Sequence, residues 1–111
     1  MSNGVLPHPC NGVLFDKWEP YYFFAKIGEE YGEMSEAYLD VLINGNDGDE
    51  PDAGMDERWH HLMLECTDTI VAINGFMEAM GCNEHDRQLF VKEINASNGK
   101  RDGGKRFKKG E

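Results

Sequence analysis

PYYFFAKIGEEYGEMSEAYLDVLI, residues 20–43, is the stretch that decides the fold of this chain. Pro20 stands where proline is tolerated, in the first turn of a helix. The large apolar residues that follow recur every three or four positions and are Phe23, Phe24, Ile27, Tyr31, Met34, Tyr38, Val41 and Leu42. Such spacing gathers side chains into one stripe along a helix. The pattern therefore predicts a long amphipathic helix from Pro20 to about Ile43.

A second helix is predicted from about Met55 to Met80, with Asp56 suited to cap its start and Gly81 to stop it. Apolar residues occur on nearly every side of this helix, which predicts a central and largely buried element. The intervening residues 44–54, NGNDGDEPDAG, are turn formers and acids, and they predict a loop.

A third helix is predicted from about Asn83 to Ala96. Residues 1–19 read as an irregular, turn-rich segment in which VLFDKW forms a short strand or a helical turn, and residues 99–111 read as a basic, flexible tail. The fold class is therefore all-α: a single domain, residues 1–111, with a helical core over residues 20–98. The helices are expected to form an antiparallel bundle whose four-helix-type core is completed by oligomerisation, because so short a chain encloses a small core.

The net charge of −10 is unevenly distributed, since residues 1–99 hold 19 acidic and five basic residues. An acidic body disfavours the nucleic-acid backbone, so no stable nucleic-acid partner is expected, whereas a site for divalent cations is compatible with it. The three cysteines show no metal-ligand spacing, and there is neither a signal-peptide pattern nor an apolar run long enough to span a membrane. These features predict a cytoplasmic protein.

Two pairs of acids have the i, i+3 spacing that places both side chains on one face of a helix: Glu30 with Glu33, and Glu65 with Asp68. Glu33 lies ten residues before Ile43, and Glu65 lies ten residues after Met55. In an antiparallel pair of helices, equal counts from the loop mean equal heights. The four carboxylates are therefore expected to converge, and divalent cations are the natural compensation for their repulsion. Ligation by oxygen alone favours Mg²⁺, or Mn²⁺.

The motif Lys26-x-x-Glu29-Glu30-x-x-Glu33, followed by Glu65-x-x-Asp68, resembles the signature of MazG-type all-α nucleoside triphosphate pyrophosphohydrolases. The string EYGEMSEAY, residues 30–38, is similar to the metal-binding helix of the dCTP pyrophosphatase branch. The resemblance implies catalysis by four Mg²⁺-binding acids and hydrolysis of an NTP or dNTP to the monophosphate and pyrophosphate. It also implies a homodimer or homotetramer.

The same resemblance implies the residues that contact the substrate. Asn95 matches in relative position a substrate-contacting asparagine, Lys100 and Arg101 lie where phosphate contacts are often placed, and Trp18 resembles an aromatic residue at the border of a base pocket. Lys26 is a further candidate for holding phosphate. Ala72 stands where the dCTP branch has a tyrosine, so the base preference stays open.

Two other interpretations remain. A di-iron carboxylate bundle needs two Glu-x-x-His motifs, and the chain offers only Glu57-x-x-His60. A non-catalytic helical adaptor that dimerises through apolar faces would explain the methionines and aromatic residues, and its acids would be a solvated surface.

Overall fold

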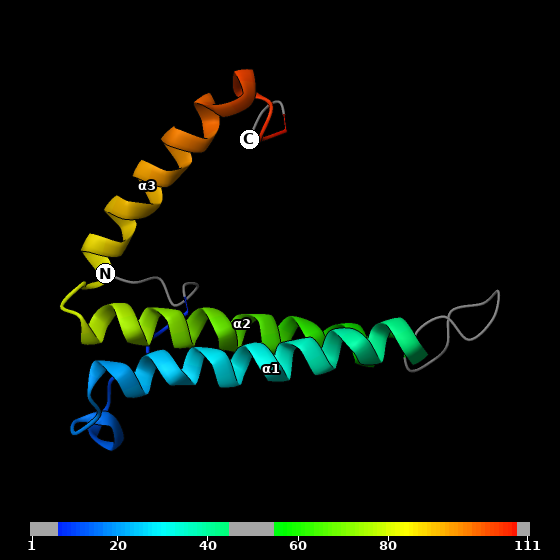
Figure 1. Cartoon of the computed structure of the whole chain (residues 1–111), viewed down its shortest axis with the longest axis horizontal. Helices are drawn as coiled ribbons and strands as arrows, with labels where there is room; N and C mark the ends of the chain where they lie inside the picture. Colours follow the sequence, from blue (N-terminus) through cyan, green and yellow to red (C-terminus); the bar gives the residue numbers. More distant parts are fainter. Residues whose placement is uncertain (1–6, 45–54, 109–111) are drawn as a thin grey trace. The chain divides into compact units, whose positions relative to one another are not determined.

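The computed structural model describes residues 7–44 and 55–108. Three α-helices occur in these ranges: α1 (Pro20–Asn44), α2 (Met55–Ala79) and α3 (Glu84–Lys100), together with the 3-10 turns η1 (Val13–Phe15) and η2 (Arg101–Gly104) (Figure 1). The described residues contain no strand, which confirms the all-α prediction. The predicted loop between the first two helices lies almost entirely outside the described residues.

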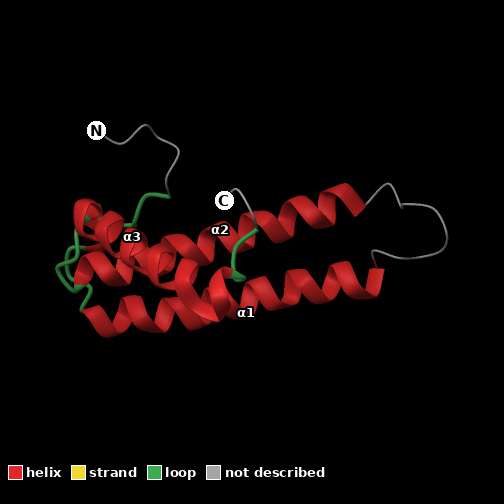
Figure 2. Ribbon diagram, turned by 90° about the horizontal axis from the view of Figure 1, so that it is seen from above, coloured by secondary structure: helices red, strands yellow, loops and turns green. Residues whose placement is uncertain are grey.

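The chain divides into two compact units, Met1–Met80 and Gly81–Glu111. The first unit is built on α1 and α2, which run antiparallel and side by side along their length (Figures 1 and 2). Ala37 is 4% exposed and Ala72 is 9% exposed, and their short side chains let the two helices approach closely. Phe23 is buried near the start of α1. The sequence therefore predicted this helical hairpin correctly, including the start of both helices.

The prediction that the second helix is largely buried was wrong for the chain as the structure describes it. Exposed fractions reach 57% for Trp59, 47% for Ile70 and 64% for Met80. In the Met1–Met80 unit α2 packs against α1 alone among the helices, and a helix with one helical neighbour buries only one stripe.

The segment before α1 forms the 3-10 turn Val13–Phe15. Of the two conformations predicted for VLFDKW, a short strand or a helical turn, the structure therefore has the helical turn. Two side-chain amides hold the residues before this turn on α2. Asn74 Nδ2 donates to the carbonyl oxygen of Pro7 (3.3 Å), and Asn11 Nδ2 donates to Glu78 Oε1 (2.9 Å). This part of the predicted irregular segment is therefore held against the hairpin.

The second unit begins with Gly81, which stops the preceding helix with a φ of 91° that favours glycine. Asn83 and Asp86 form a capping box at the start of α3. The structure differs from the prediction at the other end, because α3 continues to Lys100. There Asp102, Gly103 and Gly104 have positive φ and turn the chain.

Part of the predicted basic tail, residues 101–108, makes local contacts after the end of α3. Arg106 donates to Asp102 Oδ2 (2.8 Å) and to Asn98 Oδ1 (3.1 Å). The ring of Phe107 lies against Gly99. The positive φ angles of Gly103 and Gly104 permit the chain to reverse here, and the side-chain bonds of Arg106 hold this reversal. None of the described helices is both long and apolar enough to cross a membrane.

Candidate functional site

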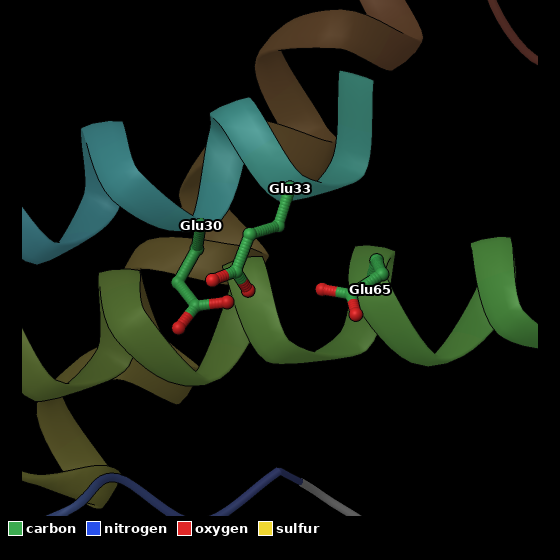
Figure 3. A group of neighbouring side chains, drawn as sticks. All are labelled: Glu30, Glu33 and Glu65. Atoms are coloured by element: carbon green, nitrogen blue, oxygen red, sulfur yellow. The ribbon is translucent and has the colours of Figure 1, made fainter. Parts of the chain in front are cut away.

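Three glutamates meet at the seam between α1 and α2 (Figure 3). Glu30 and Glu33 project from α1 and Glu65 from α2, and one carboxylate oxygen of each lies within 4.8 Å of the others. The equal heights that the sequence predicted for Glu33 and Glu65 account for this meeting. Figure 3 shows the carboxyl groups pointing toward one another across the seam.

Two oxygens of this cluster are buried without compensation. Glu30 is only 8% exposed, and none of the described residues donates a hydrogen bond to Glu30 Oε2 or to Glu65 Oε2. Buried polar atoms in proteins nearly always have a partner, so a buried oxygen that lacks one is unusual. These two oxygens are therefore available to a cation.

Lys26 supplies part of the positive charge. Its Nζ lies 3.2 Å from Glu30 Oε1 and 3.6 Å from Glu29 Oε1. The bond to Glu30 is the main reason that the pKa of Lys26 is raised, so this amine stays charged at neutral pH. One ammonium group faces three converging carboxylates, and the cluster remains net negative.

The repulsion between the carboxylates of the cluster changes the pKa of Glu33. The charge of Glu30 raises the pKa of Glu33, with smaller contributions from burial and from Glu65. Glu33 is exposed, so a proton or a cation reaches it directly from solvent.

The raised pKa of Glu33 gives a pH-dependent prediction. A carboxyl whose pKa is higher in the folded chain than in the unfolded chain adds stability that is complete at low pH and is lost as pH rises through the folded value. In metal-free buffer, Glu33→Gln should therefore melt above the wild type at neutral pH. The difference should vanish as pH falls below the ordinary pKa of a glutamate. Melting curves of both proteins from about pH 4 to about pH 8 measure this effect. A variant less stable than the wild type at neutral pH would contradict it.

Asp68, the fourth predicted ligand, is not part of the three-carboxylate group. It is exposed and lines a neighbouring cavity together with Glu30. Aspartate is one methylene shorter than glutamate, and Asp68 lies almost one turn beyond Glu65. The sequence placed both acids on one face, but the i, i+3 spacing alone did not show how far each carboxylate reaches across the seam.

The neighbouring cavity, of about 160 Å³, has aromatic walls. Phe15, Trp18 and Phe23 form one side, where the Trp18 ring centroid lies 4.8 Å from that of Phe15 and 5.0 Å from that of Phe23. Lys26 and Glu30 connect this cavity to the carboxylate cluster. The structure therefore places Trp18 and Lys26, both predicted substrate contacts, beside the cluster.

Sequence reasoning missed Gly75, a buried glycine of α2 that lines this cavity. A Cβ at this position would lie 3.4 Å from the Phe23 ring and 4.0 Å from the backbone nitrogen of Cys10. A glycine within a helical pattern is a signal of close approach by another part of the chain.

A second hollow, of about 290 Å³, opens on the other side of the cluster. Glu33 and Glu65 line it together with Glu36, Asp40 and His61. His61 Nε2 lies 3.8 Å from Glu65 Oε1. Glu36 and Asp40 were not predicted to take part, although their spacing on α1 places them one turn or two from Glu33.

The remaining predicted substrate contacts belong to the second unit. Asn95 lines a shallow hollow with Ala96, Gly99 and Phe107, and Lys100 and Arg101 follow at the junction of α3 and η2. Their role in binding substrate stays a prediction.

Comparison of the chain with protein-family models, with curated proteins and with solved structures finds no significant match. Fold and site together define an antiparallel helical hairpin that carries a buried carboxylate cluster beside an aromatic cavity.

Proposed function

We propose that this chain is a Mg²⁺-dependent hydrolase that cleaves nucleoside or deoxynucleoside triphosphates between the α and β phosphates, giving the monophosphate and pyrophosphate. The observation that carries this proposal is the pair of buried, unpartnered oxygens of Glu30 and Glu65, which come from two helices and lie within reach of Glu33. The resemblance of the two acidic motifs to MazG-type enzymes supports the same reaction.

The donor set fits Mg²⁺ or Mn²⁺, because every candidate ligand in the cluster is a carboxylate oxygen. Mg²⁺ held by few carboxylates keeps several waters and completes its shell with substrate phosphates. Asp68 lies at the adjacent cavity, from which it supports the cluster as a fourth acid. The exposed side chain of Glu33 leaves the cation accessible to a triphosphate.

The aromatic cavity offers a place for the base. A planar ring gains stacking and apolar burial against Trp18 and its neighbours, while the triphosphate extends toward the glutamates. Lys26 stands between the two places and is suited to contact phosphate. The resemblance also implies that Asn95, Lys100 and Arg101 contact the substrate and that the protein is a homodimer or homotetramer.

When bound, Mg²⁺ neutralises charge on the transferring phosphoryl group and lowers the pKa of a bound water. The chain's own residues hold the ion, orient the triphosphate and exclude water from the aromatic cavity. A glutamate of the cluster takes the proton of the attacking water. The products are released into solvent on the side of Glu33, where the cluster is open.

The test is a panel of NTPs and dNTPs incubated with the protein and Mg²⁺, with separate assays for pyrophosphate and phosphate. We expect pyrophosphate and a nucleoside monophosphate in equal amounts. Release of phosphate would show that a different bond is cut, and no turnover with any member of the panel would reject the proposed reaction.

Cation binding itself gives an independent prediction. Mg²⁺ that binds only the folded chain should stabilise it by about 2.7 kcal/mol at a concentration one hundred times its dissociation constant. Melting temperature as a function of added Mg²⁺ and Mn²⁺ measures this effect, with choline chloride at matched ionic strength as the control. An equal shift with choline would show general screening rather than a site.

The second candidate function is a non-catalytic adaptor that associates through its apolar surface. The observation that favours it is the exposure of large apolar side chains on both helices of the hairpin, such as Phe24 of α1 at 62% and Trp59 of α2 at 57%. An adaptor of this kind should show no stabilisation by Mg²⁺ beyond that of the matched salt, so the titration above separates the two functions.

A further inference from the structure

The two compact units of the chain carry opposite net charges. Met1–Met80 holds 16 acidic and three basic residues, a net charge of −13, whereas Gly81–Glu111 holds five acidic and eight basic residues, a net charge of +3. Six of those eight basic residues fall within residues 100–109. The acidic character that disfavours a nucleic-acid backbone therefore belongs to the first unit and does not extend to the end of the second.

The basic residues of the second unit flank a turn and do not trail along an extended chain. Positive φ angles at residues 102–104 reverse the chain after α3, and the ring of Phe107 then lies against Gly99 of that helix. The side-chain bonds of Arg106 hold this reversal. A surface that is already folded loses less entropy on binding than an extended segment does. We call this surface the basic turn and define it by four side chains: Lys100, Arg101, Lys105 and Lys108.

The charges of the basic turn are not neutralised within the part of the chain that the structure describes. Asp102 is the one acidic residue between Lys100 and Lys108, and its Oδ2 lies 2.8 Å from Arg106 Nε. None of the four defining side chains makes an ion pair with a described residue, and all four are exposed. Exposed cations without a counter-charge attract a polyanion, because each phosphate contact releases a condensed counterion.

A shallow hollow with an aromatic wall adjoins these charges. Its volume is about 510 Å³, and its lining is Asn95, Ala96, Gly99 and Phe107. Phe107 is 37% exposed, so part of its ring is open to solvent. Aromatic rings of this kind stack on nucleobases, and the amide of Asn95 can both donate to and accept from the edge of a base. The second unit therefore combines charge for a phosphate backbone with a ring and an amide for a base.

These features fit a single-stranded nucleic acid better than an anionic membrane. A helix that lies in a membrane surface needs one apolar face. Leu89, Phe90 and Val91 of α3 are consecutive, so at about 100° per residue they point in three directions. A hollow beside an exposed ring serves a base that is free to stack, and the bases of a single strand are free in this way whereas those of a duplex are not.

We infer that the basic turn binds the phosphate backbone of a single-stranded RNA or DNA, while one base stacks on Phe107 in the adjoining hollow. The contact is independent of sequence, with a dissociation constant on the order of 10⁻⁵ M near physiological salt, as is typical of non-specific binding. The inference rests on the second unit alone and stands whether or not the chain hydrolyses nucleotides. Lys105, Phe107 and Lys108 have no part in the proposed hydrolysis.

The test is fluorescence anisotropy of the full-length protein with a labelled strand of about 20 nucleotides, which exceeds the roughly 4–16 nucleotides that one binding fold covers. An RNA and a DNA of the same sequence are titrated in metal-free buffer at several salt concentrations, and the wild type should bind. A preference for one of them would identify the sugar that the turn accepts.

The double variant Lys105→Gln/Lys108→Gln removes two phosphate contacts. It should reduce the slope of log affinity against log salt by about 1.4 and weaken binding by about 10-fold or more at about 0.1 M salt. The matched control is Lys17→Gln/Lys92→Gln, which removes the same charge from two exposed lysines outside the basic turn. The control should bind nearly as tightly as the wild type.

Phe107→Leu tests the stacking. Leucine keeps an apolar side chain against Gly99 but has no ring, so the helical circular dichroism signal should be unchanged. Binding of either oligonucleotide should weaken by about 5-fold or more. Binding of inorganic polyphosphate, which has charge but no bases, should stay the same. A Phe107→Leu protein that binds the oligonucleotides as tightly as the wild type would contradict the stacking.

Three results would overturn the inference as a whole. The first is a wild type that binds neither oligonucleotide. The second is an equal loss of binding in the two double-lysine variants, since total charge and not the basic turn would then set the affinity. The third is binding to phosphatidylserine vesicles in place of both oligonucleotides, which would assign the basic turn to a membrane surface.

Discussion

Glu30→Gln should reduce Mg²⁺-dependent turnover by at least about 100-fold, because even the removal of a group that only supports a metal ligand costs 10- to 100-fold. Glu30 is the most deeply buried acid of the cluster and holds one of its two unpartnered oxygens. Glutamine keeps the size of the side chain but removes the charge that attracts the cation. The helical circular dichroism signal should be unchanged.

The same variant should lose the stabilisation by Mg²⁺ that the wild type shows. Without metal it should be at least as stable as the wild type, since a neutral amide is cheaper to bury than a carboxylate that has one unpartnered oxygen and lies beside two other carboxylates. Lys26 keeps a partner in this variant, because Glu29 lies 3.6 Å from its Nζ.

The matched control is Glu29→Gln, which changes the adjacent acid. The side chain of Glu29 is 62% exposed, so we expect both turnover and the Mg²⁺ response to stay close to those of the wild type. If Glu30→Gln keeps both properties, the cluster does not bind the catalytic cation. If it loses turnover but keeps the Mg²⁺ response, Glu30 acts in the reaction without being an essential ligand.

Phe23→Ala should have the largest effect on stability, a loss of about 3 kcal/mol, which is typical of removing a buried phenylalanine. Phe23 is 8% exposed, and its ring packs between the Trp18 ring and the backbone of Gly75. Its loss detaches the aromatic group before α1 from α2 and widens the cavity beside the carboxylates. Urea unfolding followed by circular dichroism measures the change.

Leu64→Ala is the comparison for this prediction, because Leu64 is 52% exposed and lies away from the cavity. It should cost about 0.5 kcal/mol or less. Equal costs for the two substitutions would show that the aromatic group does not hold the N-terminal segment on the hairpin. In the proposed enzyme, Phe23→Ala should also lower kcat/KM while the Mg²⁺ response is kept, since the glutamates are unchanged.

The candidate site shows where sequence reasoning succeeds and where it stops. Counting residues from the loop brought Glu30, Glu33 and Glu65 to one level, because the rise per residue of a helix is fixed. The same counting included Asp68, which the structure leaves outside the group, since reach across a seam depends on side-chain length and on the rotation of each helix. Glu36 and Asp40 were overlooked because ordinary surface residues have the same spacing.

By itself, the sequence determined the helices of this protein, because apolar periodicity, Pro20 and Gly81 are local signals and helix hydrogen bonds are local too. Only the tertiary structure decided which carboxylate oxygens lose their partners, that Phe15 and Gly75 frame a cavity, and that the apolar residues of α2 stay on the surface. Those properties depend on contacts between residues far apart in the chain, and burial is a property of all the neighbours of a side chain together.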